Sequence, residues 1–434
     1  MKITPITHPL KATVRVPGSK SLTNRALLIA SLADGTTHLT NALFSDDSRY
    51  FAKALQTLGF DVQLDEVAYS MIVTGLGGKI PAKKAELFIG NAGTAARFLS
   101  AFLTLGNGEY VLDGEPRMRE RPIGDLVDSL TQLGAMIMPV ERSTLNVRRQ
   151  ICPPVKIASN GLPGGKTAIA GDISSQFLSA LLMVAPYAQS EIEITLSTDL
   201  NSKPYVDMTI AIMKDFGVEI ERDNYSQFTI RSASYLPLTN YPIESDASAA
   251  SYFFAAPAIC GGTVRVENIS RKSIQGDIAF LDVFKQMGCQ VIEGENFIEV
   301  TGTESLIGVD VDMRDIPDTA QTLAVIAPFA SSPTRIRGIA SARVKETDRV
   351  SATCTELKRL GVEVEEHEDG MTIYPTFNLQ PSTFKPATVQ TYNDHRMAMA
   401  FSLIGLRFDG VTIENPSCVS KTFPNYFEVL EALQ

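Results

Sequence analysis

The sequence of 434 residues contains no tryptophan, only four histidines and only five cysteines. The cysteines form no C-x-x-C pair and the histidines form no H-E-x-x-H pattern, so we predict neither a metal site nor a disulfide framework. No apolar run reaches the length of a membrane-spanning helix, and the N-terminus lacks the apolar segment of a signal peptide. These absences predict a cytoplasmic protein with no membrane partner.

An excess of positive charge is also absent, because 39 basic residues face 49 acidic ones and the net charge is −10. Such a charge argues against a nucleic-acid partner, and it requires any anion-binding site to be a local cluster of Lys and Arg. The composition, with 44% hydrophobic and 20% charged residues, is that of a globular protein. A chain of this length exceeds the size at which one hydrophobic core stops growing, so we expect two or more domains.

What the sequence does contain is an internal repeat. Helix-like segments that end in an apolar residue and a glycine recur five times, each followed by a short strand-like run such as VEIER or VEVEE. The glycines lie between 71 and 83 residues apart, and we expect them to be the left-handed C-caps of amphipathic helices. They are Gly59, Gly134, Gly217, Gly288 and Gly361.

A second series of helix-like segments is apolar nearly all round and rich in small residues. These segments begin near Lys20, Ala92, Ser174, Asp246, Asp318 and His395. The two series predict surface helices that alternate with buried ones in six α/β units, and hence two domains of three units each. Because the last unit lacks its closing strands, we expect the strand-like residues 6–16 to complete the domain that contains the C-terminus.

The motif PGSKS, residues 17–21, opens the first of these apolar segments. It is not a nucleotide P-loop, because Ser19 and not glycine precedes Lys20, and no glycine lies five residues before Gly18. A helix start still attracts anions through its unpaired N–H groups and the helix dipole. If the units surround a local axis, the polar starts of several buried helices converge into an anion-binding cleft.

Basic residues gather beside the same predicted helix starts. They are Lys20, Arg25, Arg97, Arg117, Arg119, Arg121, Arg343, Lys345, Arg349, Arg396 and Lys421. Arg117 and Arg119 fit a solvated surface equally well. The acidic candidates are Asp318, Glu346, Asp348 and Asp394. Taken from the residues alone, these carboxylates are helix caps or partners of surface ion pairs as readily as catalytic groups.

Ten motifs, taken together and in this order, resemble the EPSP synthase (3-phosphoshikimate 1-carboxyvinyltransferase) family. They are PGSKSLTNRALL, GNAGTAARF, EPRMRERPIGDL, SSQFLSALLM, SKPYVDMT, DASAASYF, IPDTAQTLA, RVKETDR, NDHRMAMAFSL and KTFPNYF. The resemblance implies a two-domain inside-out α/β barrel in which each domain is built from three βαβαββ repeats. It assigns residues 19–244 to an N-terminal domain on the shikimate 3-phosphate side. Residues 1–18 and 245–434 form a C-terminal domain that completes the cleft and contacts phosphoenolpyruvate.

The resemblance also implies an enzyme of the shikimate pathway, which leads to chorismate and the aromatic amino acids. In the implied reaction, the 5-hydroxyl of shikimate 3-phosphate adds to C2 of phosphoenolpyruvate while C3 is protonated, and the tetrahedral intermediate then loses phosphate. The family needs no metal or organic cofactor and is monomeric. Such chemistry requires a base at the hydroxyl, an acid at the methylene carbon, and several cations around the phosphates and carboxylates.

The family motifs assign this chemistry to particular residues. The implied ligands of shikimate 3-phosphate are Lys20, Ser21, Arg25, Ser174, Ser175, Gln176, Ser202, Tyr205, Asp318, Ser341 and Lys345. The implied ligands of phosphoenolpyruvate are Lys20, Gly93, Arg121, Gln176, Arg349, Arg396 and Lys421. Asp318 is the implied base and Glu346 the implied proton donor. Lys20 and His395 are expected to assist them.

Two positions depart from the family pattern. Phe98 stands where many members have Pro, and Ser341 stands where several have Asn near the shikimate phosphate. Family members bind the inhibitor glyphosate at the phosphoenolpyruvate site. Because Gly93 leaves room there, we predict that glyphosate inhibits this protein.

Two alternative functions remain on the same scaffold. The first is the sister enolpyruvyl transferase that acts on UDP-N-acetylglucosamine, which typically carries Asn after the first Lys and often a reactive Cys in the loop matching EPRMRERP. Here the residue is Ser21, and no cysteine lies between Met1 and Arg121. The second is a non-catalytic protein that binds a phosphorylated metabolite. Binding alone would not require Asp318 and Glu346, whose charges oppose anion affinity.

Overall fold

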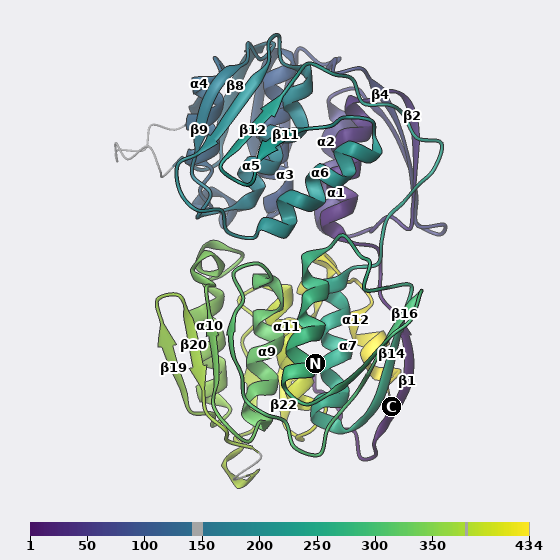
Figure 1. Cartoon of the computed structure of the whole chain (residues 1–434), viewed down its shortest axis with the longest axis vertical. Helices are drawn as coiled ribbons and strands as arrows, with labels where there is room; N and C mark the ends of the chain where they lie inside the picture. Colours follow the sequence, from purple (N-terminus) through teal and green to yellow (C-terminus); the bar gives the residue numbers. More distant parts are fainter. Residues whose placement is uncertain (141–150, 378–380, 434) are drawn as a thin grey trace. The chain divides into compact units, whose positions relative to one another are not determined.

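The computed structural model describes residues 1–140, 151–377 and 381–433. The chain folds into two compact units (Figure 1). The N-terminal unit is Gly18–Ile243, and the C-terminal unit is Met1–Pro17 together with Glu244–Gln434. The predicted domain boundaries, after residues 18 and 244, lie one residue from these division points.

Within the described residues, the N-terminal unit has three four-stranded sheets of one topology, in which a parallel pair is extended by two antiparallel strands. The first sheet has the order β13 (Tyr241–Pro242), β2 (Asp34–Thr40), β4 (Ser70–Leu76), β3 (Asp61–Asp65). The second has the order β5 (Lys84–Phe88), β6 (Asn107–Asp113), β8 (Val155–Asn160), β7 (Met136–Pro139). The third has the order β9 (Gly165–Ile169), β10 (Ile192–Leu196), β12 (Gln227–Ile230), β11 (Glu221–Asp223). The shared topology is the structural form of the sequence repeat.

The C-terminal unit repeats this topology twice and then stops short, as far as its described residues show. Its first sheet has the order β1 (Leu10–Arg15), β14 (Gly262–Glu267), β16 (Phe297–Thr301), β15 (Gln290–Glu293). Its second has the order β17 (Asp310–Asp312), β18 (Thr334–Arg337), β20 (Gly370–Ile373), β19 (Val364–His367). Its third holds β21 (Ala387–Val389) and β22 (Val411–Ile413).

The N-terminal segment belongs to the unit that contains the C-terminus. Strand β1 pairs in parallel with β14, with Leu10 opposite Gly262, so it joins the first sheet of this unit and not the last. Only the first residues reach the last sheet, where Lys2 bridges Thr412. The N-terminal segment therefore supplies the first strand of the unit's first sheet. Only its first residues also contact the short last sheet.

Helices of two kinds alternate along the chain, as the sequence predicts. The buried helices are α1 (Lys20–Leu32), α3 (Gly93–Phe102), α5 (Ser175–Val184), α7 (Ala247–Cys260), α9 (Ala320–Ile326) and α11 (His395–Gly405). The others are α2 (Asp46–Thr57), α4 (Gly124–Gln132), α6 (Lys203–Asp215), α8 (Phe280–Gln286), α10 (Arg349–Arg359) and α12 (Tyr426–Glu431). All five repeat glycines have φ between 86° and 96°, which confirms the predicted left-handed positions after the amphipathic helices.

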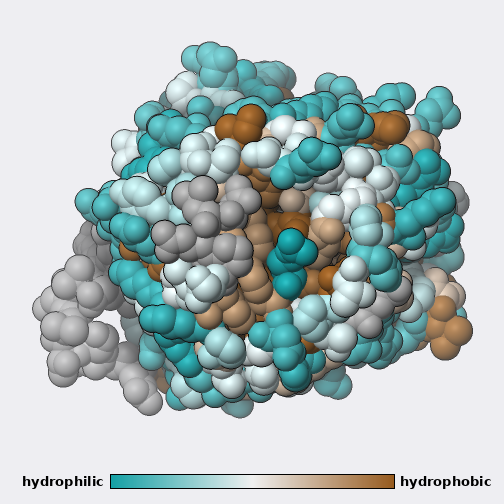
Figure 2. All heavy atoms as spheres, turned by 90° about the horizontal axis from the view of Figure 1, so that it is seen from below, coloured by the Kyte–Doolittle hydropathy of each residue, from teal (hydrophilic) through white to brown (hydrophobic). Residues whose placement is uncertain are grey.

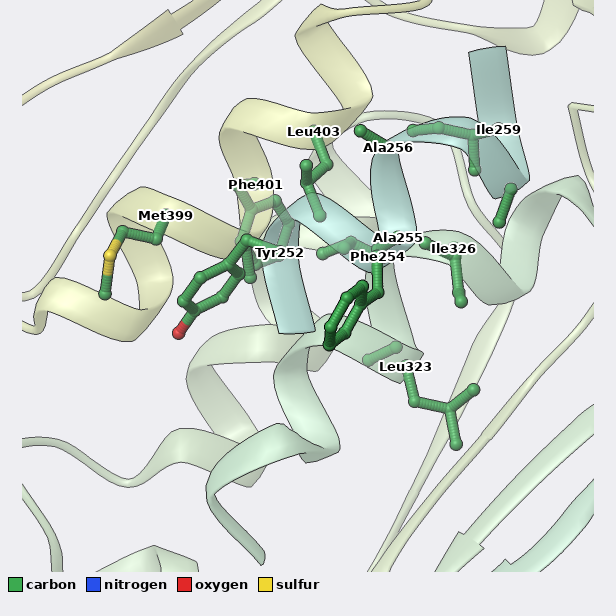
Figure 3. Close-up of a cluster of buried hydrophobic side chains, with 14 of the residues drawn as sticks. Tyr252, Phe254, Ala255, Ala256, Ile259, Leu323, Ile326, Met399, Phe401 and Leu403 are labelled. Atoms are coloured by element: carbon green, nitrogen blue, oxygen red, sulfur yellow. The ribbon is translucent and has the colours of Figure 1, made fainter. Parts of the chain in front are cut away.

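The core of the C-terminal unit lies where α7, α9 and α11 pack against one another. Figure 3 shows Tyr252 and Phe254 of α7 near Leu323 of α9 and Phe401 of α11. Small residues such as Ala255 lie among these large side chains and let the helix backbones approach. Each fully buried large apolar side chain stabilises the fold by about 1.5–3 kcal/mol. This packing holds the three helix starts together at one end of the bundle.

No helix in the described parts of the chain is long and apolar enough to cross a membrane.

Candidate active site

Charged side chains of the C-terminal unit gather at the starts of three helices. Asp318 lies in the 3-10 turn Pro317–Thr319 that leads into α9. Asp348 caps α10 by accepting a hydrogen bond from the backbone N–H of Ser351 at 3.0 Å. Asp394 caps α11 in the same way, accepting from the N–H of Arg396 at 2.9 Å. Each carboxylate satisfies or faces N–H groups that a helix start leaves unpaired, which is why these short motifs fold locally.

Arg349 is the centre of this cluster. Its Nε donates to Asp394 Oδ2 at 2.8 Å, its Nη1 to Asp318 Oδ1 at 3.1 Å, and its Nη2 to Glu346 Oε2 at 2.7 Å. The side chain is only 4% exposed. Burial by itself would lower the pKa of Arg349, but the three carboxylates outweigh it and raise that pKa above its ordinary value. Arg349 is therefore a permanent positive charge that joins three chain segments.

Arg396 binds Asp318 from another side. Its Nη2 donates to Asp318 Oδ2 at 2.7 Å, and its Nη1 donates to the backbone oxygen of the same residue at 3.0 Å. Asp318 thus lies between two guanidinium groups, while its side chain is still 19% exposed. The Tyr252 hydroxyl lies 3.5 Å from Arg396 Nη1. Burial raises the pKa of this tyrosine to about 12, although the charge of Arg396 acts to lower it. Asp318 is thus a partly exposed carboxylate held by two buried cations.

Glu346 has a cation on each side. Besides Arg349, Lys421 approaches it, with Nζ 3.8 Å from Oε1. His395 lies nearby in the same network, with Nδ1 3.5 Å from Asp394 Oδ1. The structure thus brings together every predicted phosphoenolpyruvate or catalytic residue of this unit. They are Asp318, Glu346, Arg349, His395, Arg396 and Lys421.

Two predicted residues of the C-terminal unit stand slightly apart from this cluster. Ser341 lies in the 3-10 segment Ala340–Val344, which packs against the Pro317–Thr319 turn, and Lys345 follows directly. Both are half-buried. The segment that carries Ser341 thus lies against the turn that holds Asp318.

Arg25 is the central cation of the N-terminal unit. Its Nε donates to Thr209 Oγ1 at 2.7 Å, and its Nη2 donates to the backbone oxygen of Tyr205 at 3.2 Å. The guanidinium also lies over the ring of Phe98 at 5.3 Å. Burial lowers the pKa of Arg25 to about 10, which leaves it charged at neutral pH. The position that departs from the family pattern, Phe98, is therefore a packing partner of a predicted ligand.

Lys20 is the first residue of α1, after the N-cap Ser19, whose Oγ accepts from Leu22 N at 3.4 Å. The Lys20 ammonium lies 3.6 Å from Asp47 Oδ2, and Asp47 is buried. Because Ser21 is the next residue of α1, its position is set by the same helix start. The PGSKS motif is thus a helix start with a charged residue, as the sequence predicts.

The start of α3 approaches Arg121 closely. A Cβ placed on Gly93 would lie 2.4 Å from Arg121 Nη2, so any side chain there would displace the guanidinium. Arg121 Nη1 donates to the backbone oxygen of Asn91 at 3.1 Å. Arg97, one turn further along α3, donates to the backbone oxygen of Gly93 at 3.0 Å. Glycine is required at this position to let an arginine lie against the helix start.

The remaining predicted residues lie at two further helix starts of the N-terminal unit. Ser174 caps α5, and its Oγ accepts from Gln176 N at 3.3 Å, with Ser175 between them. Ser202, with φ of 58°, precedes α6, which carries Tyr205. Arg25 connects these helices, because its Nη2 also lies 3.4 Å from Ser179 Oγ on α5.

Sequence reasoning left several participants out of the site. Asp394 was an acidic candidate to which the family motifs assigned no role, yet it is fully buried and bonded to Arg349. The sequence carried no functional signal for Asp47, Tyr252 or Asn91. Asp47 lies at a predicted helix start, Tyr252 lies in a predicted buried helix, and Asn91 lies in a turn. Their roles depend on contacts between segments far apart in the sequence, such as Tyr252 with Arg396 at 3.5 Å.

The C-terminal ends of the buried helices of the C-terminal unit border a cavity that differs from the charged cluster at their starts. The cavity, of about 450 Å³, is lined by Ile259 near the end of α7, by Phe329 after α9, and by Phe408 after α11. Its charged residues are Glu304 and Arg407. Figure 2 shows a largely hydrophilic face on which apolar side chains gather in a hollow. One cation beside one carboxylate does not make an anion-binding cluster, so the helix starts are the candidate site.

Among the described residues, no group of three His, Cys, Asp or Glu side chains is arranged to hold a metal ion. The three carboxylates that converge in the C-terminal unit surround a guanidinium instead. The cations at the helix starts of both units are suited to small substrates with several negative charges.

Two repeat-built α/β units with clustered cations and carboxylates define an enzyme class that works on small anionic metabolites. Within that class, the chain belongs to the EPSP synthase (3-phosphoshikimate 1-carboxyvinyltransferase) family, whose model matches residues 4–430.

Similar proteins cover almost the whole chain. A Trichormus variabilis protein named 3-phosphoshikimate 1-carboxyvinyltransferase is 51% identical over 422 residues, which are 97% of this chain and 96% of that protein. A Sulfurovum protein of the same name is 50% identical and covers 98% of this chain and 97% of its own length. The solved EPSP synthase of Acinetobacter baumannii is 27% identical, has a TM-score of 0.80, and covers 99% of this chain and 97% of its own. This likeness confirms the predicted fold class.

Proposed function

We propose that this protein transfers the enolpyruvyl group of phosphoenolpyruvate to the 5-hydroxyl of shikimate 3-phosphate and releases phosphate. The observation that carries the proposal is the convergence of Asp318, Glu346 and Asp394 on buried Arg349. A binding protein gains nothing from placing carboxylates among the cations that hold an anion. A transferase that moves protons needs both, and the family to which the chain belongs has this activity in its name.

The proposed substrate contacts follow the helix starts. Shikimate 3-phosphate is assigned to Lys20, Ser21, Arg25, Ser174, Ser175, Gln176, Ser202, Tyr205, Asp318, Ser341 and Lys345. Phosphoenolpyruvate is assigned to Lys20, Gly93, Arg121, Gln176, Arg349, Arg396 and Lys421. The burial of Arg25 and Arg349 supports these assignments, because a desolvated cation gains more from an anionic ligand than an exposed one.

The proton steps are assigned to two carboxylates. Asp318 accepts the proton of the 5-hydroxyl while the hydroxyl oxygen forms a bond to C2 of phosphoenolpyruvate. Glu346 delivers a proton to C3. The tetrahedral intermediate then loses phosphate and a proton from C3, which restores the double bond. An incoming anion competes with Glu346 for Arg349 and Lys421. Lys20 and His395 assist.

Phosphate release without added metal tests the function. The purified protein is supplied with phosphoenolpyruvate and either shikimate 3-phosphate or UDP-N-acetylglucosamine. We expect release only with shikimate 3-phosphate. Release with the nucleotide sugar would identify the sister transferase. Release with neither, despite calorimetric binding of shikimate 3-phosphate, would identify a non-catalytic binding protein.

Lys20→Met is expected to weaken phosphoenolpyruvate binding measured by calorimetry in the presence of shikimate 3-phosphate. The ammonium lies at the start of α1, and an anion buried without its cation loses its compensation. The control is Lys53→Met, because Lys53 is exposed on α2 and away from any helix start. Equal affinities for the Lys20→Met variant and the wild type would remove Lys20 from the phosphoenolpyruvate contacts.

Glyphosate is expected to inhibit competitively with phosphoenolpyruvate. Gly93→Ala is expected to raise both the inhibition constant and the KM for phosphoenolpyruvate, because the new Cβ displaces Arg121. The new Cβ meets the far end of the flexible Arg121 side chain, so we expect a rise of about tenfold, which corresponds to about 1.4 kcal/mol. An inhibitor titration with no effect far above the KM of phosphoenolpyruvate would contradict the first expectation. Unchanged constants for the variant would contradict the second.

We propose a monomer, since one chain carries both sets of proposed contacts, and a cytoplasmic location. Sedimentation of the purified protein at the mass of one chain tests the monomer.

A further inference from the structure

A buried carboxylate on α10 has no part in the substrate contacts. Glu356 is 1% exposed, and it accepts four hydrogen bonds. Arg359 Nη1 donates to both of its oxygens, at 2.9 Å and 2.7 Å. The backbone N–H of Gln390 donates to Oε2 at 3.0 Å, and the hydroxyl of Tyr392 donates to Oε1 at 2.9 Å. Two of these bonds tie α10 to the segment before α11.

That segment has an unusual backbone. Tyr392 and Asn393 are consecutive, and their φ values are 53° and 54°. A non-glycine residue in the left-handed region is uncommon, and such strain persists only where surrounding contacts over-determine it. The next residues are Asp394, His395 and Arg396, which form the start of α11 in the charged cluster. The strained turn therefore sets the direction from which these side chains enter the site.

One face of α10 contacts both ends of the turn. Arg349 and Glu356 are seven residues apart, which is two helical turns, so they lie on the same face. Arg349 bonds Asp394 after the strained pair, and Glu356 bonds Gln390 and Tyr392 before and within it. The helix thus clamps residues 390–394 at two points.

The clamp has further support. Thr353, between the two charged residues of α10, contacts Met397 of α11, with Oγ1 3.6 Å from Sδ. Asn415 Nδ2 donates to Asn393 Oδ1 at 3.2 Å and holds the turn from its other side. Burial and the hydrogen bond to Glu356 raise the pKa of Tyr392 to about 12, so its hydroxyl remains a donor at neutral pH.

We propose that Glu356 is a positioning residue that fixes the left-handed turn at Tyr392 and Asn393 and so directs Arg396 and His395 toward phosphoenolpyruvate. The inference rests on the proposed function, because it requires Arg396 to bind this substrate. A positioning role differs from a purely structural one in a measurable way. Substitution of a purely structural carboxylate would change the stability of the protein and leave the kinetics of the folded enzyme intact.

The test is steady-state kinetics of Glu356→Gln and Tyr392→Phe. Hydrogen bonds to charged groups are the stronger ones, so their loss in Glu356→Gln is expected to raise the KM for phosphoenolpyruvate about tenfold. The KM for shikimate 3-phosphate is expected to stay within about twofold, because Arg396 is assigned to phosphoenolpyruvate alone. Glu365→Gln is the control, because exposed Glu365 also accepts a tyrosine hydroxyl bond, from Tyr374 at 3.0 Å.

An unchanged KM for phosphoenolpyruvate in folded Glu356→Gln would overturn the proposal, even if the melting temperature falls. If Glu356→Gln does not fold, Tyr392→Phe decides in the same way, because it removes one hydrogen bond and keeps the ring. An equal rise in both KM values would also overturn it, since that result indicates general damage.

Arg396→Met, measured in parallel, separates this proposal from the proposed function. If Arg396→Met leaves the KM for phosphoenolpyruvate unchanged, the proposed substrate contact is wrong. If that KM rises while Glu356→Gln has no effect, only the positioning role is wrong. If Arg396→Met and Glu356→Gln each raise the KM for phosphoenolpyruvate, the variant that carries both changes is expected to show the KM of Arg396→Met alone. The reason is that Glu356 affects this binding through Arg396.

Discussion

Glu346→Gln is expected to lower kcat by at least about 100-fold, the lower range for a general acid–base group. Glutamine keeps the shape of the side chain and can still accept the bond from Arg349 Nη2, but it has no ionisable carboxyl. Phosphate release under saturating substrates measures kcat. Calorimetry with shikimate 3-phosphate is expected to give an affinity close to that of the wild type.

Two results would speak against this role for Glu346. A near-normal kcat would remove Glu346 from the proton steps. A loss of shikimate 3-phosphate affinity as large as the loss of kcat would make it a binding group. Asp318→Asn serves as the matched comparison, because it also neutralises a carboxylate bonded to Arg349.

Arg349→Met is expected to lower the free energy of unfolding by about 3–5 kcal/mol, the cost of leaving buried charges without their partner. Three carboxylates would lose the one guanidinium that they share. Because the protein has no tryptophan, urea unfolding is best followed by circular dichroism. The variant is also expected to lose measurable binding of phosphoenolpyruvate.

Two matched variants test the physical reason. Arg349→Lys keeps the charge, but an ammonium cannot present three donors in the fork that Arg349 uses, so we expect an intermediate loss. Arg15→Met breaks an exposed pair with Glu267 in the same unit and is expected to cost less than about 1 kcal/mol. A loss in Arg349→Met no larger than in Arg15→Met would show that the buried cluster adds nothing to stability.

The repeat was readable from the sequence because helices and glycines mark it locally. Gly59 and Gly361 end amphipathic helices with φ of 96° and 92°, a conformation that favours glycine wherever it occurs. The alternation of buried and surface helices follows from side-chain periodicity in the same way. Both signals depend on neighbours within a few turns, so they survive without tertiary information.

Strand pairing was less predictable. The strand-like residues 6–16 were expected to close the C-terminal domain, but only the structure shows that Leu10–Arg15 pairs with β14. An extended strand has the same local pattern whichever sheet it joins, because its hydrogen bonds are made to distant residues. The site showed a similar limit with Asp394, which looks like an ordinary helix cap until Arg349 is placed beside it.

The sequence by itself determined the two-domain repeat, the family, and the residues at each helix start, because ordered motifs and local capping patterns carry that information. Only the tertiary structure decided which charges meet. Arg349 lies 31 residues from Asp318 and 45 from Asp394 along the chain, yet it bonds both. Glu356 reaches Tyr392 across 36 residues in the same way. Such contacts arise where α10 lies against the turn before α9 and the segment before α11, and no local pattern encodes them.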